Sequence, residues 1–264
     1  MASLRGKASL LLFCLTAVAC SATGMAGREP APGARPRSSG PPNQVALSPS
    51  FGIKKVDVEE KLVALTFDDG PDPKYTPRVL DFARGHHIPL TFFLLGERVR
   101  LHPELARRML AEGHAIGNHT WSHTVLIGLS EAEDGAEIEA CEAEIEKICG
   151  YHTKLFRPPK GKVDETVARA AATRGYEIIL WSVAVEHHDA KTPQAMADRV
   201  VQRVRPGSII LAHDGSPHQD ISRDRTVAAL PMLVDELRRR GYRFVTVPEL
   251  LARAAKERVA RGRR

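Results

Sequence analysis

The chain has 264 residues, 43% hydrophobic and 27% charged, a composition typical of a soluble globular protein with room for one large domain or two small ones. Apart from the basic stretch RVARGRR at residues 258–264, the net charge of +6 comes from scattered lysines and arginines. The sequence has no recognition helix, zinc-finger spacing or interleaved aromatic and basic residues. No nucleic-acid partner is therefore expected, whereas weak attraction to an anionic cell envelope stays open.

Residues 1–20 have the pattern of a bacterial secretory signal. Arg5 and Lys7 precede the apolar run ASLLLFCLTAVAC, which is too short to span a bilayer. The run ends in small residues followed by Cys20, so it fits either ordinary signal cleavage or a lipoprotein signal with a lipid on Cys20. Both interpretations predict an extracytoplasmic protein of a bacterium, either secreted or anchored to the membrane.

Residues 21–55 are rich in Pro, Gly, Ser and Arg and bury too little apolar surface to fold. We expect them to form a flexible tether before a folded domain at residues 56–264. A tether that follows an anchor suits an enzyme that must reach a polymer near the membrane.

In the folded part, apolar runs alternate with amphipathic segments. Strands are predicted at residues 61–67, 90–95, 154–158, 177–185, 208–213 and 242–247. Helices are predicted at 76–86, 102–113, 130–150, 164–175, 192–204, 227–241 and from 248 onward. This alternation predicts a single α/β domain of about seven parallel βα units, either an irregular barrel or a doubly wound sheet. In both architectures the carboxyl ends of the strands carry the chemistry.

Three details of the helices are also predicted. Ser130 and Glu133 form a capping box at the start of the 130–150 helix. Cys141 and Cys149 lie eight residues apart in that helix, roughly 12 Å along its axis, which is too far for a disulfide. Pro231 should distort the 227–241 helix or mark its first turn.

Polar residues that suit a metal site follow several of these strands. His119 and His123 are four residues apart, so a helix or compact turn would direct both rings at one point. Asp68 and Asp69 end the first strand, and with a cation between them one carboxylate can bind the metal while the other stays ionised. A surface Asp-Asp-Gly-Pro turn would not account for the histidine that also ends the 208–213 strand.

Five stretches resemble the motifs of the polysaccharide deacetylases, carbohydrate esterase family four. They are TFDDGP, NHTWSH, RPPKG, a degenerate WSVAVEHH, and ILAHD, and they occur in this order between Lys61 and Leu251. The resemblance implies an irregular barrel of βα units and a divalent metal, usually zinc. It implies metal ligands at Asp69, His119 and His123, and a substrate-binding groove that includes Trp121, Lys160 and Leu211.

The resemblance also implies three catalytic roles. Asp68 matches the catalytic base, Arg157 the residue that orients this base, and His213 the general acid. In this interpretation Asp68 takes the proton of the attacking water, and His213 protonates the departing sugar amine. The expected reaction is removal of acetyl groups from N-acetylated sugars.

Two of the stretches depart from the family pattern. Lys160 stands where an aromatic residue is usual, which would favour an anionic substrate unless the side chain simply faces solvent. Ala184, His187 and His188 stand where the fourth motif usually has Asp, Asp and Trp.

The family's first Asp in that motif helps to fix the motif-three arginine, and Ala184 cannot do so. We therefore expect another carboxylate to pair with Arg157. Glu186 is the first choice because of its longer side chain, and Asp189 is the second.

The sequence thus predicts a metal-dependent deacetylase of an envelope polysaccharide, with peptidoglycan and chitin-like oligomers both open as substrates. The alternative from another class is a non-catalytic glycan-binding module on a deacetylase scaffold. The presence of the base, the three ligands and the acid argues against that alternative. A hydrolase of small cyclic amides is a third interpretation, which the signal and tether disfavour.

Overall fold

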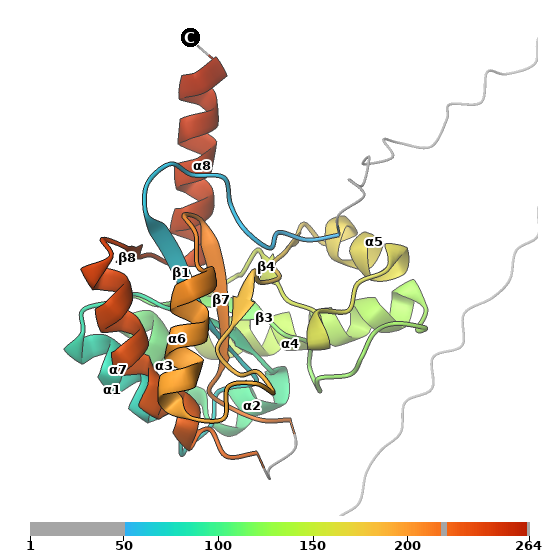
Figure 1. The fold of residues 1–264 in the computed structure, drawn as a ribbon. Helices are drawn as coiled ribbons and strands as arrows, with labels where there is room; N and C mark the ends of the chain where they lie inside the picture. Colours follow the sequence, from blue (N-terminus) through green and yellow to red (C-terminus); the bar gives the residue numbers. More distant parts are fainter. Residues whose placement is uncertain (1–50, 218–220, 263–264) are drawn as a thin grey trace, which may run out of the picture. The chain divides into compact units, whose positions relative to one another are not determined.

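The structure is a computed structural model that describes residues 51–217 and 221–262, and these residues belong to one compact unit (Figure 1). None of the helices in this part of the chain is long and apolar enough to cross a membrane. The predicted signal at 1–20 and most of the predicted tether lie outside the described residues.

The described residues form eight strands and eight α-helices. The strands are β1 Leu62–Asp68, β2 Thr91–Leu94, β3 Ala115–Asn118, β4 Leu155–Phe156, β5 Glu177–Ile178, β6 Val183–Ala184, β7 Ser208–His213 and β8 Arg243–Phe244. The helices are α1 Thr76–Gly85, α2 Gly96–Leu101, α3 Pro103–Ala111, α4 Glu131–Cys149, α5 Glu165–Thr173, α6 Pro193–Arg203, α7 Asp224–Arg239 and α8 Val247–Gly262. A short 3-10 turn, Pro159–Gly161, follows β4.

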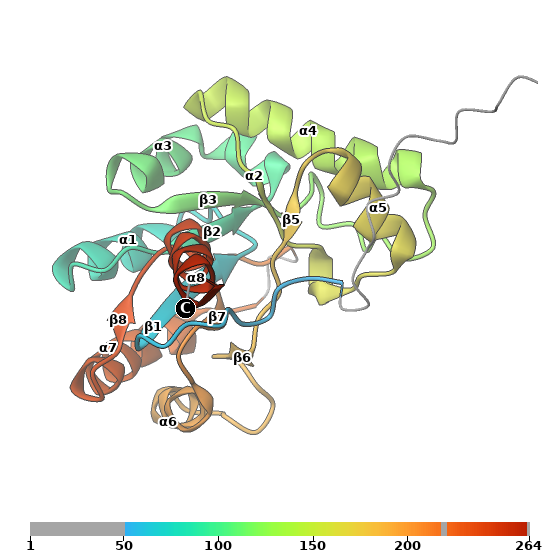
Figure 2. The same ribbon diagram turned by 90° about the horizontal axis from the view of Figure 1, so that it is seen from above.

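The strands form one parallel sheet in the order β5-β4-β3-β2-β1-β7-β6, with β8 paired to β1. The two edge strands, β5 and β6, are joined by residues 179–182 alone, so their ends lie at most about 18 Å apart. Seven strands laid flat would span about 29 Å between the edges. The sheet must therefore curl, and Figure 2 shows it surrounded by helices. This curled parallel architecture confirms the predicted α/β barrel of βα units.

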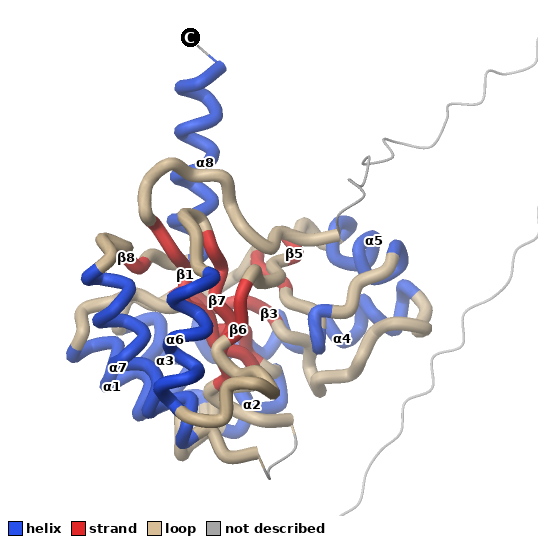
Figure 3. The backbone as a smooth tube through the Cα atoms, viewed as in Figure 1, coloured by secondary structure: helices blue, strands red, loops and turns tan. Residues whose placement is uncertain are grey.

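The strand β1 lies inside the sheet, between β2 and β7, and Figure 3 shows it beside β7. All seven of its residues are buried, as expected for a strand covered on both faces in a parallel sheet. Its continuous apolar run forms part of two separate core clusters, one on each face: Val63, Leu65 and Phe67 belong to the larger and Leu62 and Ala64 to the other. The carboxyl end of β1 is consequently held rigidly in the middle of one sheet edge.

Most predicted elements are present, but some details differ. The predicted strand 177–185 is two strands, β5 and β6, because this segment crosses from one edge of the curled sheet to the other. The strand β3 and the helix α2 were not predicted. Pro231 lies in the interior of α7, which begins at Asp224, rather than in its first turn.

The details predicted for α4 are confirmed. The Ser130 hydroxyl accepts a hydrogen bond from the Glu133 amide, while the Glu133 carboxylate accepts one from the Ser130 amide. Both cysteines of this helix are free thiols, and Cys141 is buried against the core.

Asp134, in the first turn of α4, gives a prediction on stability. The side chain is buried, and neither carboxylate oxygen has a hydrogen-bond partner in the described structure. Burial and the neighbouring carboxylates raise its pKa from 3.8 to about 6. The native state therefore holds this proton more tightly than the unfolded chain does, so stability falls as the pH rises from about 4 to about 6.

Asp134→Asn should therefore raise the free energy of unfolding at pH 7.5 by about 2–3 kcal/mol and leave it nearly unchanged at pH 4. Urea unfolding at the two pH values measures this difference. The control is Asp198→Asn, which removes an exposed carboxylate of α6 and should change little at either pH. An equal effect of Asp134→Asn at both pH values would show that the buried charge is not its cause.

Candidate active site

The carboxylates of Asp68 and Asp69, at the end of β1, both lie close to the ring of His119. In a regular strand Asp68 and Asp69 would point to opposite faces, but the backbone at Asp69 is left-handed, with φ of 73°. The chain thus leaves the strand so that Asp69 turns to the same side. The Nε2 atom of His119 lies 3.8 Å from Asp68 Oδ2 and 3.5 Å from Asp69 Oδ1.

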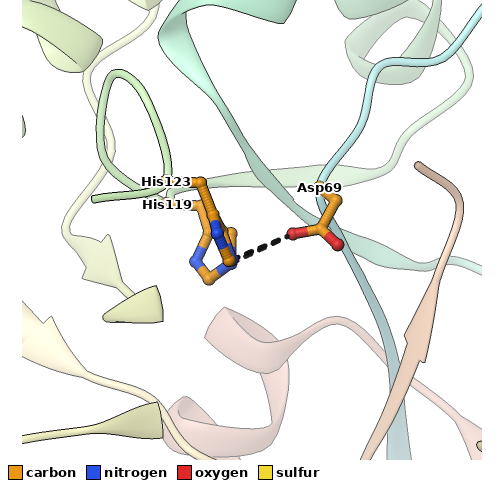
Figure 4. Close-up of side chains that lie close together, drawn as sticks. All are labelled: Asp69, His119 and His123. Atoms are coloured by element: carbon orange, nitrogen blue, oxygen red, sulfur yellow. Dashed lines mark ion pairs between the residues drawn. The ribbon is translucent and has the colours of Figure 1, made fainter. Parts of the chain in front are cut away.

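The predicted ligand residues converge on one point (Figure 4). Asp69 Oδ1 lies 3.5 Å from His119 Nε2 and 3.4 Å from His123 Nε2, and the three ligand atoms lie within 4.8 Å of one another. The two histidines follow β3 in a compact turn, where Thr120 and His123 have φ of 73° and 63°. Four of the five non-glycine residues with positive φ in the described structure belong to this site: Asp69, Thr120, His123 and Lys160.

The chemistry of this ligand set fits a divalent cation such as zinc. The Nδ1–H of His119 donates to the carbonyl oxygen of Arg157 at 2.6 Å, which leaves Nε2 as a free electron-pair donor. Burial, with the nearby His119, lowers the pKa of His123 to about 4, so its ring is neutral at pH 7, as a ligand must be. Asp69 Oδ1 is buried and accepts no hydrogen bond. A carboxylate oxygen in this state is suited to bind a cation.

Asp68 is held by a buried arginine. Arg157 is completely buried, and its Nη1 donates to Asp68 Oδ1 at 2.6 Å and to Thr66 Oγ1 at 2.8 Å. Its Nε and Nη2 donate to the carbonyl oxygens of Ile179 and Leu180 at 3.0 and 3.2 Å. The carboxylate of Asp68 is thus fixed beside the ligand set, where it can accept a proton from a water molecule.

His213, at the end of β7, is paired with Glu186 rather than exposed alone. Its Nδ1 lies 3.2 Å from Glu186 Oε2, and its backbone N–H donates to Glu186 Oε1 at 3.1 Å. Burial lowers the pKa of His213, but the charge and hydrogen bond of Glu186 outweigh it, so the pKa is raised. A raised pKa favours the protonated imidazole, which is the form that can act as a general acid.

The expected pairing of Glu186 with Arg157 is therefore wrong. Glu186 follows β6 and pairs with the imidazole of His213. In the sheet order β6 and β7 lie on one side of β1, whereas β4, which Arg157 follows, lies on the other. Asp189, the second choice, instead lies 3.3 Å from His187 Nδ1 and 2.9 Å from His188 Nε2. Arg157 needs no additional carboxylate, because Asp68, Thr66 and two carbonyl oxygens already satisfy it.

Arg223, which precedes α7, was not predicted as a site residue. Its side chain is buried, and Nε donates to the carbonyl oxygen of Gly215 at 2.7 Å. Its two terminal nitrogens lie 3.5 Å from Asp69 Oδ2 and 4.0 Å from Glu186 Oε1. Asp69 therefore directs one oxygen to the histidines and the other to Arg223, and one guanidinium links the loops after β1, β6 and β7.

The three residues predicted to bind substrate lie in different environments. Lys160 is exposed in the 3-10 turn after β4. Trp121 is half-buried over α2, with the Arg100 guanidinium carbon 4.9 Å from its ring centroid. Leu211 is buried within β7, paired in register with Thr66 and Ala184, and exposes only 4% of its surface.

Comparison with known proteins agrees with this arrangement. The family model described as "Polysaccharide deacetylase" matches residues 55–179. A peptidoglycan-N-acetylglucosamine deacetylase of Bacillus cereus is 41% identical over 199 residues, which cover 75% of this chain and 91% of that protein. A chitooligosaccharide deacetylase of Sinorhizobium fredii is 37% identical over 194 residues, which cover 71% and 90%. The chain therefore belongs to the polysaccharide deacetylase family, carbohydrate esterase family four.

Solved structures are similar over the same region. A peptidoglycan N-acetylglucosamine deacetylase superposes with a TM-score of 0.71 at 34% identity, covering 75% of this chain and 91% of that chain. A pseudoenzyme of carbohydrate esterase family four from Bacillus anthracis superposes with a TM-score of 0.70 at 27% identity, covering 78% and 70%. Because the fold also occurs in a pseudoenzyme, activity must be argued from the site residues of this chain.

The Glu186–His213 pair gives a testable pKa. In Glu186→Gln the negative charge is lost while the side-chain shape is retained, so the pKa of His213 should fall. Titration of the imidazole resonances by NMR measures the shift directly. Asp189→Asn is the control, because Asp189 contacts His187 and His188 instead, and it should leave His213 unchanged. An unaltered His213 titration in Glu186→Gln would contradict this account of its charge.

Proposed function

We propose that the protein is a metal-dependent N-deacetylase of an extracytoplasmic bacterial polysaccharide, with peptidoglycan or a chitin-like glycan as substrate and zinc as the metal. The observation that carries the proposal is the convergence of a base, a ligand set and an acid at the carboxyl ends of three strands of one sheet. Asp68 ends β1, His119 directly follows β3, and His213 ends β7 in register with Asp68. The family membership of the chain supports the same chemistry.

In the proposed reaction, water hydrolyses an acetamide to acetate and a sugar amine. A zinc ion held by Asp69, His119 and His123 would polarise the acetamide carbonyl and make a nearby water more acidic. Asp68, oriented by Arg157, accepts the proton of the attacking water. A backbone N–H of the Pro159–Gly161 turn assists in stabilising the oxyanion. His213, kept protonated by Glu186, donates its proton to the leaving nitrogen, which is a poor leaving group without it.

The alternative function is a non-catalytic glycan-binding module. A binding module would have no need for a buried arginine that donates a hydrogen bond to Asp68 or for a carboxylate that raises the pKa of His213. Turnover distinguishes the two functions, since a binding module releases no acetate.

The catalytic roles can be tested by acetate release from peptidoglycan and chitopentaose with added zinc. Asp68→Asn should retain the metal but lose about 10²–10⁴-fold in turnover, because the amide cannot accept the proton. Asp189→Asn is the matched control and should turn over normally, since this exposed carboxylate lies outside the ligand set. No acetate release from any N-acetylated glycan by the wild-type chain, or full activity in Asp68→Asn, would contradict the proposal.

Metal content provides an independent readout of the ligand set. The wild-type chain should bind close to one divalent ion, and His119→Ala should lose most of it, because one of three protein ligands is removed. His152→Ala removes an exposed histidine that pairs with Glu142 and Glu146, so it should retain the metal. Equal metal content in the two variants would rule out His119 as a ligand.

The proposed location rests on the signal-like residues 1–20 and is tested at the mature N-terminus. Mass spectrometry should find a chain that begins at or near Cys20 after expression of the full sequence in a bacterium. A diacylglyceryl group on Cys20, lost in Cys20→Ser and kept in Cys14→Ser, would show a lipid anchor. An unmodified N-terminus near Cys20 would indicate a secreted enzyme, and retention of Met1 would refute export.

A further inference from the structure

Lys160 lies on a turn that is fixed directly beside the ligand set. Three residues earlier, Arg157 is locked against Asp68, and the Arg157 carbonyl oxygen accepts the hydrogen bond of His119. At the other end of the turn, Gly161 packs on the ring of Trp181, where a Cβ atom would come within 2.6 Å of the ring.

The ammonium group of Lys160 has no carboxylate partner in the described part of the chain. The other cations at the site are paired: Arg157 with Asp68, Arg223 with Asp69, and the protonated His213 with Glu186. Lys160 forms neither an ion pair nor a side-chain hydrogen bond with any described residue, and its side chain is exposed. It is thus a free cation at the edge of the proposed catalytic centre.

The backbone gives no reason for a lysine at this position. Lys160 has φ of 57° and ψ of 14°, a left-handed conformation that glycine adopts at a lower cost than any residue with a Cβ atom. Residues held in such conformations cluster at active sites and ligand-binding sites, which is consistent with a contact between Lys160 and a bound ligand.

The charges around the site favour an anion as that contact. The three carboxylates Asp68, Asp69 and Glu186 lie among three permanent cations, Arg157, Arg223 and Lys160, and the imidazole of His213 adds a further positive charge when protonated. A bound divalent ion makes the sum more positive still, so the site attracts anionic ligands and offers no such attraction to a neutral sugar.

We propose that Lys160 binds a carboxylate of the glycan substrate and thereby makes the protein prefer acidic N-acetylated glycans over neutral ones. The substrate class is a glycan in which a sugar at or next to the reacting N-acetyl group carries a carboxylate, as N-acetylmuramic acid does through its lactyl ether. The proposal rests on the proposed deacetylase function, since it concerns the substrate of the same site.

The test compares two tetrasaccharides of alternating N-acetylglucosamine and N-acetylmuramic acid, one with free lactyl carboxylates and the other with their methyl esters. The two probes differ only in charge and one methyl group. Calorimetry with the full-chain Asp68→Asn protein, in which turnover should be strongly slowed, measures binding on a time scale shorter than the reaction. Acetate release by the wild-type chain measures kcat and KM for both probes.

The acid should bind about three- to tenfold more tightly than the ester, the range expected for one partly exposed charge-assisted contact. Lys160→Gln should abolish this preference, mainly through KM, and Lys160→Arg should preserve it because the charge is retained. The control is Lys162→Gln, which removes another exposed lysine two residues away and should keep the preference. Raising the salt concentration should weaken binding of the acid only.

Equal binding of acid and ester to Asp68→Asn would overturn the proposal, as would a preference that survives in Lys160→Gln. Either result would leave the deacetylase function intact if acetate is still released. Conversely, a Lys160-dependent preference without acetate release from any glycan would support this binding contact and refute the proposed catalysis. The binding comparison therefore tests the role of Lys160, and acetate release tests the deacetylase function.

Discussion

The buried ion pair between Arg157 and Asp68 is the interaction on which the site depends. A guanidinium removed completely from water is strongly destabilising unless its charge is paired and its N–H groups are bonded. Here the guanidinium donates hydrogen bonds to one carboxylate, one hydroxyl and two carbonyl oxygens. In addition, the Phe93 ring centroid lies 3.9 Å from the guanidinium carbon. The arrangement ties the end of β4 to the end of β1, two strands that are not neighbours in the sheet.

The same arginine also determines the state of a proposed metal ligand. Because its carbonyl oxygen accepts the Nδ1–H of His119, the tautomer of that ring is fixed and Nε2 faces Asp69. Loss of the Arg157 side chain would thus leave Asp68 buried without a cation and would loosen the backbone that orients His119. Arg157 therefore positions both the base, through its side chain, and the ligand set, through its backbone carbonyl group.

Histidines at this site differ in charge because their surroundings differ. His123 is half-buried and shares the Asp69 carboxylate with His119, and desolvation together with the nearby His119 lowers its pKa to about 4. His213 is also half-buried, but Glu186 accepts its Nδ1–H and raises its pKa. One imidazole is therefore suited to donate an electron pair and the other to donate a proton.

How much the sequence could predict depends on the length of each element. The long apolar runs of β1 and β7 and the helices with clear caps were predicted, since their periodicity is sufficient evidence. β3 was missed because four residues ending in Gly-Asn carry little pattern. Glu186 was assigned to the wrong partner because it was judged by closeness in sequence. The register that pairs Ala184 with Leu211 puts Glu186 beside His213, and that register follows from the curl of the sheet, which no local pattern reveals.

The adjacent carboxylates of Asp68 and Asp69 show how the fold makes an unfavourable pair of residues useful. Their mutual repulsion is relieved separately, since Arg157 holds one and Arg223 lies beside the other. The left-handed turn at Asp69 then brings both to the same side of β1, which a strand alone could not do. With each carboxylate already matched by an arginine, a bound cation is not needed to neutralise the pair, so its charge remains available to act on a substrate.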